Sequence, residues 1–126
     1  MSHPVKIFSS GLLHGPMPTA DITRDLRTDL PDPAYALDGS MRDLTGLNPM
    51  VRRHVFGTPG ALDILADVKA DVLARAASGP VTVAFACAGG KHRSVALAQA
   101  LHDQLVTVGV PALVQHLHVH LPRVIK

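Results

Sequence analysis

Aromatic residues, cysteine and glutamate are scarce or missing in this sequence. It has no tryptophan, one tyrosine and three phenylalanines, which argues against a surface that stacks the bases of single-stranded nucleic acid. The lone cysteine, Cys87, cannot form an internal disulfide, and no leader-like segment precedes the first predicted strand, so a cytoplasmic location is expected. No apolar run reaches the roughly 18 to 20 residues of a membrane span, so no membrane partner is expected.

Charge of either sign is also sparse. All ten acidic residues are aspartates, and twelve lysines and arginines leave a formal net charge of +2. Because so small a net charge attracts anions only weakly, anion binding has to come from local clustering of cations. The chain has 126 residues, of which 47% are hydrophobic, and this predicts a single domain over residues 1–126 with one core.

Short apolar runs between glycines and prolines predict four strands. They are expected at residues 5–8, 22–26, 81–86 and 112–121. Asn48-Pro49 and Thr58-Pro59 each place a side-chain acceptor before a proline, a pattern typical of a helix start. A third helix is expected to follow Ser94 and to stop at Gly109. The alternation predicts a small α/β sandwich with a largely parallel or mixed sheet flanked by helices.

The apolar pattern also predicts which faces are buried. In the second and third helices, apolar residues recur every three or four positions. They are Leu62, Leu65, Val68, Val72 and Ala76 in the second helix, and Leu97, Leu101, Leu105 and Val108 in the third. The apolar run at 81–86 is typical of a strand buried on both faces. In the last strand, alternation predicts Leu113, Leu117, Val119 and Leu121 on one face and His116, His118 and His120 on the other.

The segment from Cys87 to Ser94 joins the carboxyl end of that buried strand to a helix start, where ligands favour binding in α/β folds. Its two glycines permit backbone N–H groups to converge on an anion, and the helix N-terminus adds partial positive charge. A guanidinium can hold phosphate oxygens in bidentate fashion. The candidate phosphate ligands are Gly89, Gly90, Lys91, His92, Arg93 and Ser94. The alternative interpretation is a glycine turn with solvated cations.

The same segment is not a Walker A loop, because Phe85 stands where that motif needs its first glycine. It does fit C-x5-R-S, the pattern of the phosphate loop of cysteine-dependent phosphatases. In that interpretation Cys87 is a nucleophile, since a helix N-terminus and cations favour the thiolate of a cysteine. Asp21, Asp25 and Asp43 are the candidate general acids. The other interpretation of Cys87 is a small buried residue that closes the strand.

Four segments of the sequence together are typical of one known family. They are FSSGLLHG at 8–15, DLR at 25–27 with the prolines that follow, RDLTGLN at 42–48 and CAGGKHRSV at 87–95. In these segments the chain resembles the C-terminal domain of RapZ, a bacterial RNase adapter protein, and the resemblance covers nearly the whole chain. It implies a fold similar to a portion of phosphofructokinase. It also implies small-RNA binding, oligomerisation and sensing of an amino-sugar phosphate.

The resemblance further implies which residues hold a phosphorylated ligand. His14, Ala88, Gly89 and Arg93 match family positions implicated in that role, and His116 stands at the position of a family histidine. Three family cations are missing, because this chain has Leu13, Gln115 and Leu117 in their places. RNA affinity depends on counterion release by cations, so the resemblance supports the ligand site more strongly than an RNA surface. The family's P-loop domain is not found in the sequence, so ATP binding is not implied.

Two groups of residues keep alternative interpretations. His116, His118 and His120 have a spacing that some zinc sites use, but solvated or hydrogen-bonded histidines are the preferred interpretation and no metal site is predicted. The arginines form either a basic patch around the loop or ordinary surface charge paired with aspartates. They are Arg24, Arg27, Arg42, Arg52 and Arg53, of which Arg27 and Arg42 are the preferred ligands because they lie in family-like segments.

The sequence thus predicts a binding module for a phosphorylated small molecule, with RNA as a possible second partner and self-association as a homodimer or higher oligomer. No cofactor is expected. A cysteine-dependent phosphatase that uses Cys87 is the alternative, and the sequence leaves open whether any turnover occurs.

Overall fold

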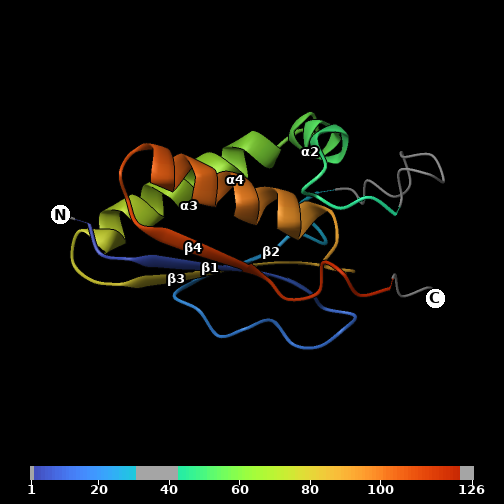
Figure 1. The fold of residues 1–126 in the computed structure, drawn as a ribbon, viewed down its shortest axis with the longest axis horizontal. Helices are drawn as coiled ribbons and strands as arrows, with labels where there is room; N and C mark the ends of the chain where they lie inside the picture. Colours follow the sequence, from blue (N-terminus) through green and yellow to red (C-terminus); the bar gives the residue numbers. More distant parts are fainter. Residues whose placement is uncertain (1, 31–42, 123–126) are drawn as a thin grey trace.

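The computed structural model describes residues 2–30 and 43–122 of the chain. Within these residues two strands are followed by two helices, and then a strand, a helix and a last strand (Figure 1). The elements are β1 Val5–Gly11, β2 Ile22–Asp25, α2 Pro49–Phe56, α3 Ala61–Ala76, β3 Val81–Cys87, α4 Arg93–Thr107 and β4 Ala112–His116. In the described ranges, no helix is both long enough and apolar enough to span a bilayer.

All four strands belong to one parallel sheet with the order β2-β3-β1-β4. Val5 of β1 pairs with Val81 of β3 on one side and with Ala112 of β4 on the other. Since the strands run in one direction, their carboxyl ends meet at the same edge of the sheet. The predicted α/β sandwich is confirmed, and its sheet is parallel.

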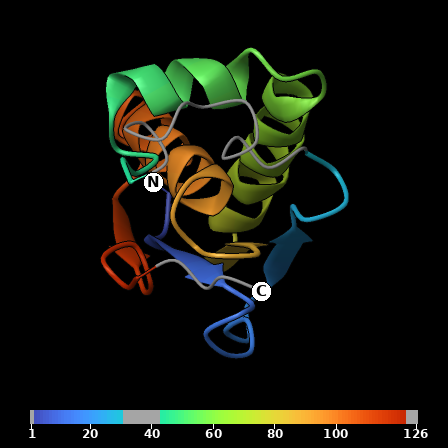
Figure 2. The ribbon, with the colours of Figure 1, turned by 90° about the vertical axis from the view of Figure 1, so that its right-hand side faces the viewer.

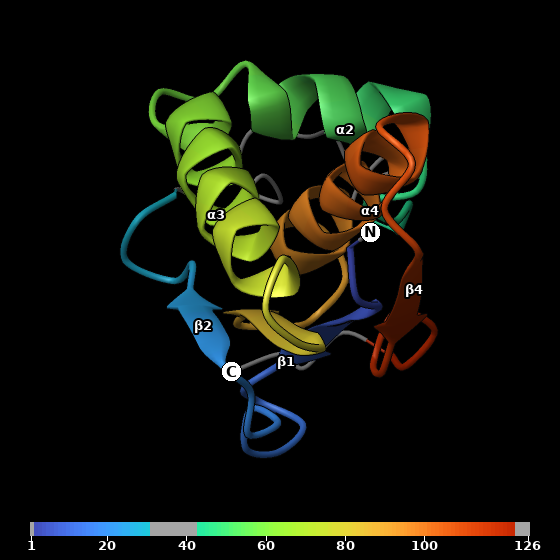
Figure 3. The same ribbon diagram turned by 90° about the vertical axis from the view of Figure 1, so that its left-hand side faces the viewer.

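The two faces of the sheet are covered differently. Helices α2, α3 and α4 lie on one side, and the loop between β1 and β2 (residues 12–21) passes along the other side (Figures 1, 2 and 3). Strand alternation places Val83 and Phe85 on one face of β3 and Ala84 and Ala86 on the opposite face, and all four are fully buried. The prediction that this strand is buried on both faces is confirmed.

One apolar core lies between the sheet and the helices. Its largest fully buried side chains come from every layer and are Phe85, Ile7, Leu26, Leu97, Leu101, Leu105, Val5, Val51, Val55, Val68, Val72 and Val83. Leu97, Leu101 and Leu105 are the predicted stripe of the last helix, and their burial confirms it. Val108 does not belong to this stripe: it lies beyond the last helical residue and is exposed, because Gly109 with a φ of 84° turns the chain.

The two predicted helix starts have different outcomes. The Asn48 side chain accepts a hydrogen bond from the N–H of Met50 at 2.9 Å, and Pro49 is the first helical residue, as predicted. The prediction for Thr58 is wrong, because α3 begins at Ala61 after Gly60, whose φ is 91°. The Thr58 hydroxyl instead donates to a carbonyl of the preceding helix, that of His54, at 3.1 Å.

Because α3 begins at Ala61, its buried face differs from the predicted one. Leu65 and Val68 are buried as predicted, but Leu62 is 61% exposed and Ala61 and Ile64 occupy the buried positions. A helical stripe has two neighbouring rows, three and four residues apart, and only packing decides which row continues.

The last strand is shorter than predicted and its faces are reversed. β4 ends at His116, and residues 117–121 form turns with a hydrogen bond from the N–H of Leu121 to the carbonyl of His118 at 3.1 Å. Leu113 is 72% exposed, whereas His116 is half-buried on the face toward α4. β4 lies at the edge of the sheet and pairs with β1. Its register with β1 therefore decides which of its side chains face the helices.

The ends of β1 and β3 approach each other backbone to backbone. A Cβ added to Gly11 would lie 2.6 Å from the amide nitrogen of Gly90, which itself has a φ of 72°. The N–H groups of Leu12 and Leu13 donate to the carbonyls of Cys87 and Ala88, both at 2.9 Å. The β1–β2 loop therefore starts in direct contact with the segment that follows β3.

Truncation of Leu65 tests the assigned face of α3. Leu65→Ala removes a buried side chain and leaves a cavity, so we expect a loss of about 2 to 5 kcal/mol of unfolding free energy. Leu62→Ala on the same helix is the matched control and should change it by less than about 0.5 kcal/mol. Urea unfolding followed by circular dichroism measures both, and equal effects would show that the face is wrong.

Gly11→Ala tests the close approach of β1 and β3. The added methyl group meets backbone atoms that cannot rotate away, so we expect the unfolding free energy to fall by about 1 to 3 kcal/mol. Gly15→Ala, where no atom lies within 4 Å of the added Cβ, should change it by less than about 0.5 kcal/mol. Thermal unfolding of the two variants compares them, and an unchanged melting temperature for Gly11→Ala would contradict the packing.

Candidate functional site

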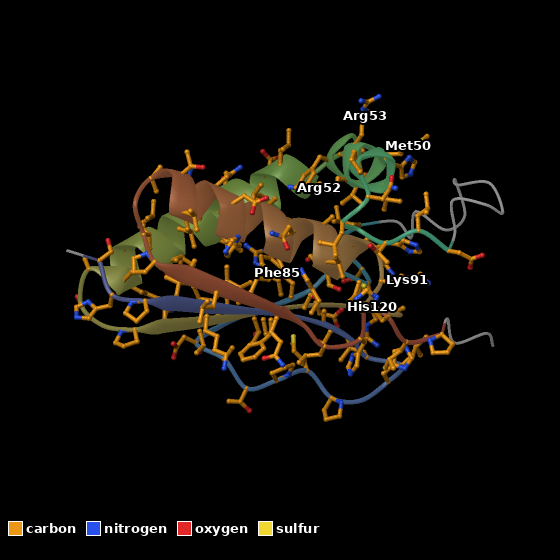
Figure 4. All side chains as sticks on the ribbon, viewed as in Figure 1. Met50, Arg52, Arg53, Phe85, Lys91 and His120 are labelled. Atoms are coloured by element: carbon orange, nitrogen blue, oxygen red, sulfur yellow. The ribbon has the colours of Figure 1, made fainter. Side chains whose placement is uncertain are left out.

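The carboxyl edge of the sheet holds most of the predicted site residues that the structure describes. Residues 87–94, called the glycine loop below, follow β3 here and lead into α4. Gly11 ends β1 at this edge, and the N–H of Leu26, just after β2, donates to the carbonyl of Ala86 at 2.7 Å. In Figure 4, Lys91 and His120 both lie toward this end of the molecule. Segments far apart in the sequence thus share one edge.

The backbone N–H groups of the glycine loop differ in exposure as well as in hydrogen bonding: Gly89 and Lys91 are partly exposed, whereas Ser94 is fully buried. The N–H of Gly90 donates to Sγ of Cys87 at 3.3 Å. For the N–H groups of Gly89, Lys91 and Ser94, the structure has no hydrogen bond to any described residue. These groups flank the N-terminus of a helix of 15 residues, which carries partial positive charge. The local chemistry suits an anion.

Arg93 is the first residue of α4 and is only 4% exposed. Its Nη1 donates to the carbonyl oxygens of Leu30 at 2.9 Å and of Leu26 at 3.3 Å. These bonds tie the turn after β2 to the start of the helix. The buried guanidinium therefore holds the turn after β2 against the start of α4.

Arg27 forms an ion pair with its neighbour Asp25, with contacts of 2.7 and 3.1 Å. The hydrogen bond from Arg27 lowers the pKa of the Asp25 carboxyl, and the same pair raises the pKa of Arg27. A phosphate group would have to compete with Asp25 for this arginine. Arg42, the other preferred cation, lies outside the described residues.

The candidate general acids are poorly placed for that role. Asp21 accepts hydrogen bonds from the backbone and hydroxyl of Thr82, near the opposite end of β3 from Cys87, and these bonds lower its pKa. Asp25 is held ionised by Arg27. A general acid needs a raised pKa at neutral pH, so the environments of both carboxyls disfavour acid catalysis. Asp43 is exposed.

Cys87 is the first residue of the glycine loop and is buried, with 2% of its surface exposed. Its Sγ is 3.2 Å from Oγ of Ser94, in addition to the N–H of Gly90. These contacts hold the two ends of the glycine loop together, which is what a structural role of Cys87 would require. The N–H of Gly90 donates to the sulfur and the Ser94 hydroxyl is able to, as a nucleophile would require.

Two histidines from the end of the chain reach this edge. The N–H of Gly11 donates to Nδ1 of His118 at 2.8 Å, and the rings of His118 and His14 have centroids 5.1 Å apart. His116 contacts Ser9 Oγ through Nδ1 at 2.6 Å. Burial lowers the pKa of His116 and of His118. His116 was a sequence candidate, whereas His118 was noted only within the row of alternating histidines.

The predicted histidine row does not form a metal site. His120 is exposed and lies beyond the end of β4. Among residues 2–30 and 43–122, no group of three or more metal-binding side chains is close enough to hold an ion.

The other candidate arginines that the structure describes lie in β2 and α2 rather than in the glycine loop. Arg24 contacts Asp67 of α3 at 4.0 Å, and Arg52 contacts Asp103 of α4 at 3.6 Å. Arg53 is exposed on the outer side of α2 (Figure 4). Their placement fits ordinary surface charge.

Gly46 contacts the glycine loop, although the sequence analysis did not identify it as a site residue. Its N–H donates to the carbonyl of Lys91 at 2.8 Å, and a Cβ there would lie 2.6 Å from the amide nitrogen of Ala96. The segment before α2 therefore packs directly against the glycine loop. The only signal in the sequence was the family-like stretch at 42–48.

Comparisons with known proteins identify the family of the chain. A nucleotide-binding protein of Streptomyces avermitilis is 38% identical over 117 residues, which cover 87% of this chain and 38% of that protein. A nucleotide-binding protein of Thermus thermophilus is 39% identical over 106 residues, which cover 80% of this chain and 38% of that protein. The chain thus spans less than two fifths of the length of these relatives. The sequence model of the RapZ C-terminal domain matches residues 3–120, and the chain belongs to that family.

Proposed function

We propose that the chain binds a phosphorylated small molecule, a sugar phosphate or a nucleotide, at the glycine loop. The observation that carries the proposal is the pair of backbone N–H groups at the partly exposed residues Gly89 and Lys91, which have no hydrogen-bond partner among the described residues. They lie at a helix N-terminus, where a phosphate replaces water as the acceptor. The names of the relatives, which are nucleotide-binding proteins, support the same ligand class.

The surrounding residues have distinct roles in this proposal. Ala88 and Gly89 supply main chain to the phosphate. Lys91 is partly exposed and offers a charge that can reach it. His14 approaches from the β1–β2 loop, where its Nε2 is buried and has no hydrogen-bond partner in the described part of the chain. Arg93 attracts the anion through its charge and holds the turn after β2.

RNA binding and self-association remain further proposals. The exposed strand β4 with Leu113 offers an edge for a second copy. RNA has weaker support, because Arg24 and Arg52 are paired with aspartates and no aromatic platform is predicted.

Calorimetric titration tests the ligand class with four probes: glucosamine 6-phosphate, glucosamine, AMP and inorganic phosphate. We expect binding of phosphorylated probes and none of glucosamine. Arg93→Ala removes a buried positive charge, and we expect binding to weaken by about 1 to 2 kcal/mol, the size of a charge–charge attraction over roughly 8 to 16 Å at an effective dielectric constant of about 20. Arg93→Lys, which keeps the charge, separates attraction from the loss of the turn contacts.

Arg53→Ala is the matched control, since it removes an exposed arginine from α2 and should leave affinity unchanged. Circular dichroism spectra establish that each variant is folded. Equal binding of glucosamine and its phosphate, or no effect in a folded Arg93→Ala, would contradict the assignment of the site.

A cysteine-dependent phosphatase is the second candidate, favoured by the contacts of Gly90 N–H and Ser94 Oγ with the Cys87 sulfur. In this reaction the thiolate attacks phosphorus, a phosphocysteine forms and the alcohol leaves with a proton, after which water releases phosphate. Hydrolysis of p-nitrophenyl phosphate by the parent and by Cys87→Ser measures it. Turnover abolished in Cys87→Ser supports the enzyme, and no turnover in the parent excludes it for this substrate.

A further inference from the structure

The contact between Gly11 and His118 restricts the protonation state of the imidazole. A backbone N–H can only donate, so Nδ1 of His118 has to present a lone pair to Gly11 at 2.8 Å. The ring is then the neutral tautomer with its proton on Nε2. Protonation would put a second N–H on Nδ1, facing the N–H of Gly11, and the hydrogen bond would be lost.

His116, two residues earlier, has no such restriction. Nε2 of Gln99 donates to Asp103 at 3.0 Å, which turns Oε1 of Gln99 toward Nε2 of His116, also at 3.0 Å. His116 therefore carries a proton on Nε2, and Nδ1 accepts from the hydroxyl of Ser9. A hydroxyl can rotate and accept instead of donating, so protonated His116 keeps both bonds.

The surroundings of His118 reinforce its neutral form. The titratable group that faces it is His14, from the β1–β2 loop, whose ring centroid lies 5.1 Å away with the ring planes tilted by 39°. In the described ranges no carboxylate pairs with either ring, so nothing compensates a positive charge there. Partial burial lowers the pKa of His118, and the proximity of His14 lowers it further.

Gly11 connects this histidine to the glycine loop. Its backbone lies against Gly89 and Gly90, so closely that a methyl group does not fit. The N–H groups that follow Gly11 donate to the carbonyls of Cys87 and Ala88. A change at the Gly11 amide is therefore transmitted to the loop through direct backbone contact.

We propose that neutral His118 is a positioning residue that locks the end of β1 against the glycine loop, and that its protonation releases the lock and weakens anion binding. The ligand part of this inference rests on the proposed function. The direction of the pH effect distinguishes this positioning role from direct contact with the anion. A protonated histidine that touched the anion would strengthen binding at low pH, whereas release of the lock weakens binding.

The first test needs no ligand. Nuclear magnetic resonance of the 15N-labelled protein follows the imidazole of His118 and the amide of Gly11 between pH 7.5 and 5.5. We expect the neutral Nε2–H tautomer at pH 7.5 and a shift of the Gly11 amide that titrates together with His118. An amide that stays unchanged while His118 titrates would overturn the lock, whether or not any ligand binds.

The second test measures affinity for inorganic sulfate, because phosphate esters change charge near pH 6 and sulfate does not. In the parent, affinity should fall about two- to tenfold between pH 7.5 and 5.5, the effect of one lost hydrogen bond. His118→Asn keeps an acceptor near Nδ1 that does not titrate, so its affinity should stay constant. His120→Asn, at an exposed histidine of the same segment, should behave as the parent does.

A parallel pH dependence of the parent and His118→Asn, or tighter sulfate binding at low pH, would overturn the proposal. Stability supplies a third readout that is independent of sulfate. The folded protein binds fewer protons than the unfolded chain when a histidine pKa is lowered, so unfolding free energy decreases as pH falls below about 6.5. This decrease should be smaller in His118→Asn, and an equal decrease in both proteins would also count against the lock.

Discussion

The close contact between Gly11 and the backbone of Gly89 and Gly90 is the constraint on which the functional edge depends. It exists because β1 and β3 are neighbours in register and end together, with Gly11 opposite Cys87. A side chain at either point would separate the two loops and move the start of α4. Glycine is needed here for space, and at Gly90 also for a positive φ.

Buried polar residues gather at the same edge. Within the described part of the chain they are Ser9, Ser10, His92, Arg93 and Ser94, all near the end of β1 or the start of α4. Elsewhere the core is apolar. Burying polar groups costs free energy unless they are hydrogen-bonded, so their concentration at one place is not explained by stability alone. Contacts such as Ser9 with His116 and Ser94 with Cys87 offset that cost while they arrange the site.

Membership of the RapZ C-terminal domain family extends over residues 3–120, although the chain spans less than two fifths of the relatives compared. The features retained here belong to the carboxyl edge of the sheet: the glycine loop, the β1–β2 loop and the segment before α2. At three positions where the resemblance implies cations that favour RNA binding, this chain has the uncharged residues Leu13, Gln115 and Leu117. In physical terms the residues that match the family suit the proposed anion site better than an extended basic surface.

The sequence alone determined the α/β architecture and the doubly buried strand at β3, and it predicted the glycine loop as the place for chemistry. These follow from local patterns: apolar periods, Asn48-Pro49 as a cap, and glycines between a strand and a helix. Leu62 and Leu113 show where local pattern fails, since register and helix packing chose which row was buried.

Only the tertiary structure decided how the site is assembled. Arg93 turned toward the carbonyls of Leu26 and Leu30, and His118 met Gly11 across the sheet edge. Each pair is far apart in the sequence, and its members are joined by the parallel register of strands whose ends coincide. The residue types in the sequence indicate which groups can bind an anion. The direction in which each side chain points depends on neighbouring residues that no local sequence pattern specifies.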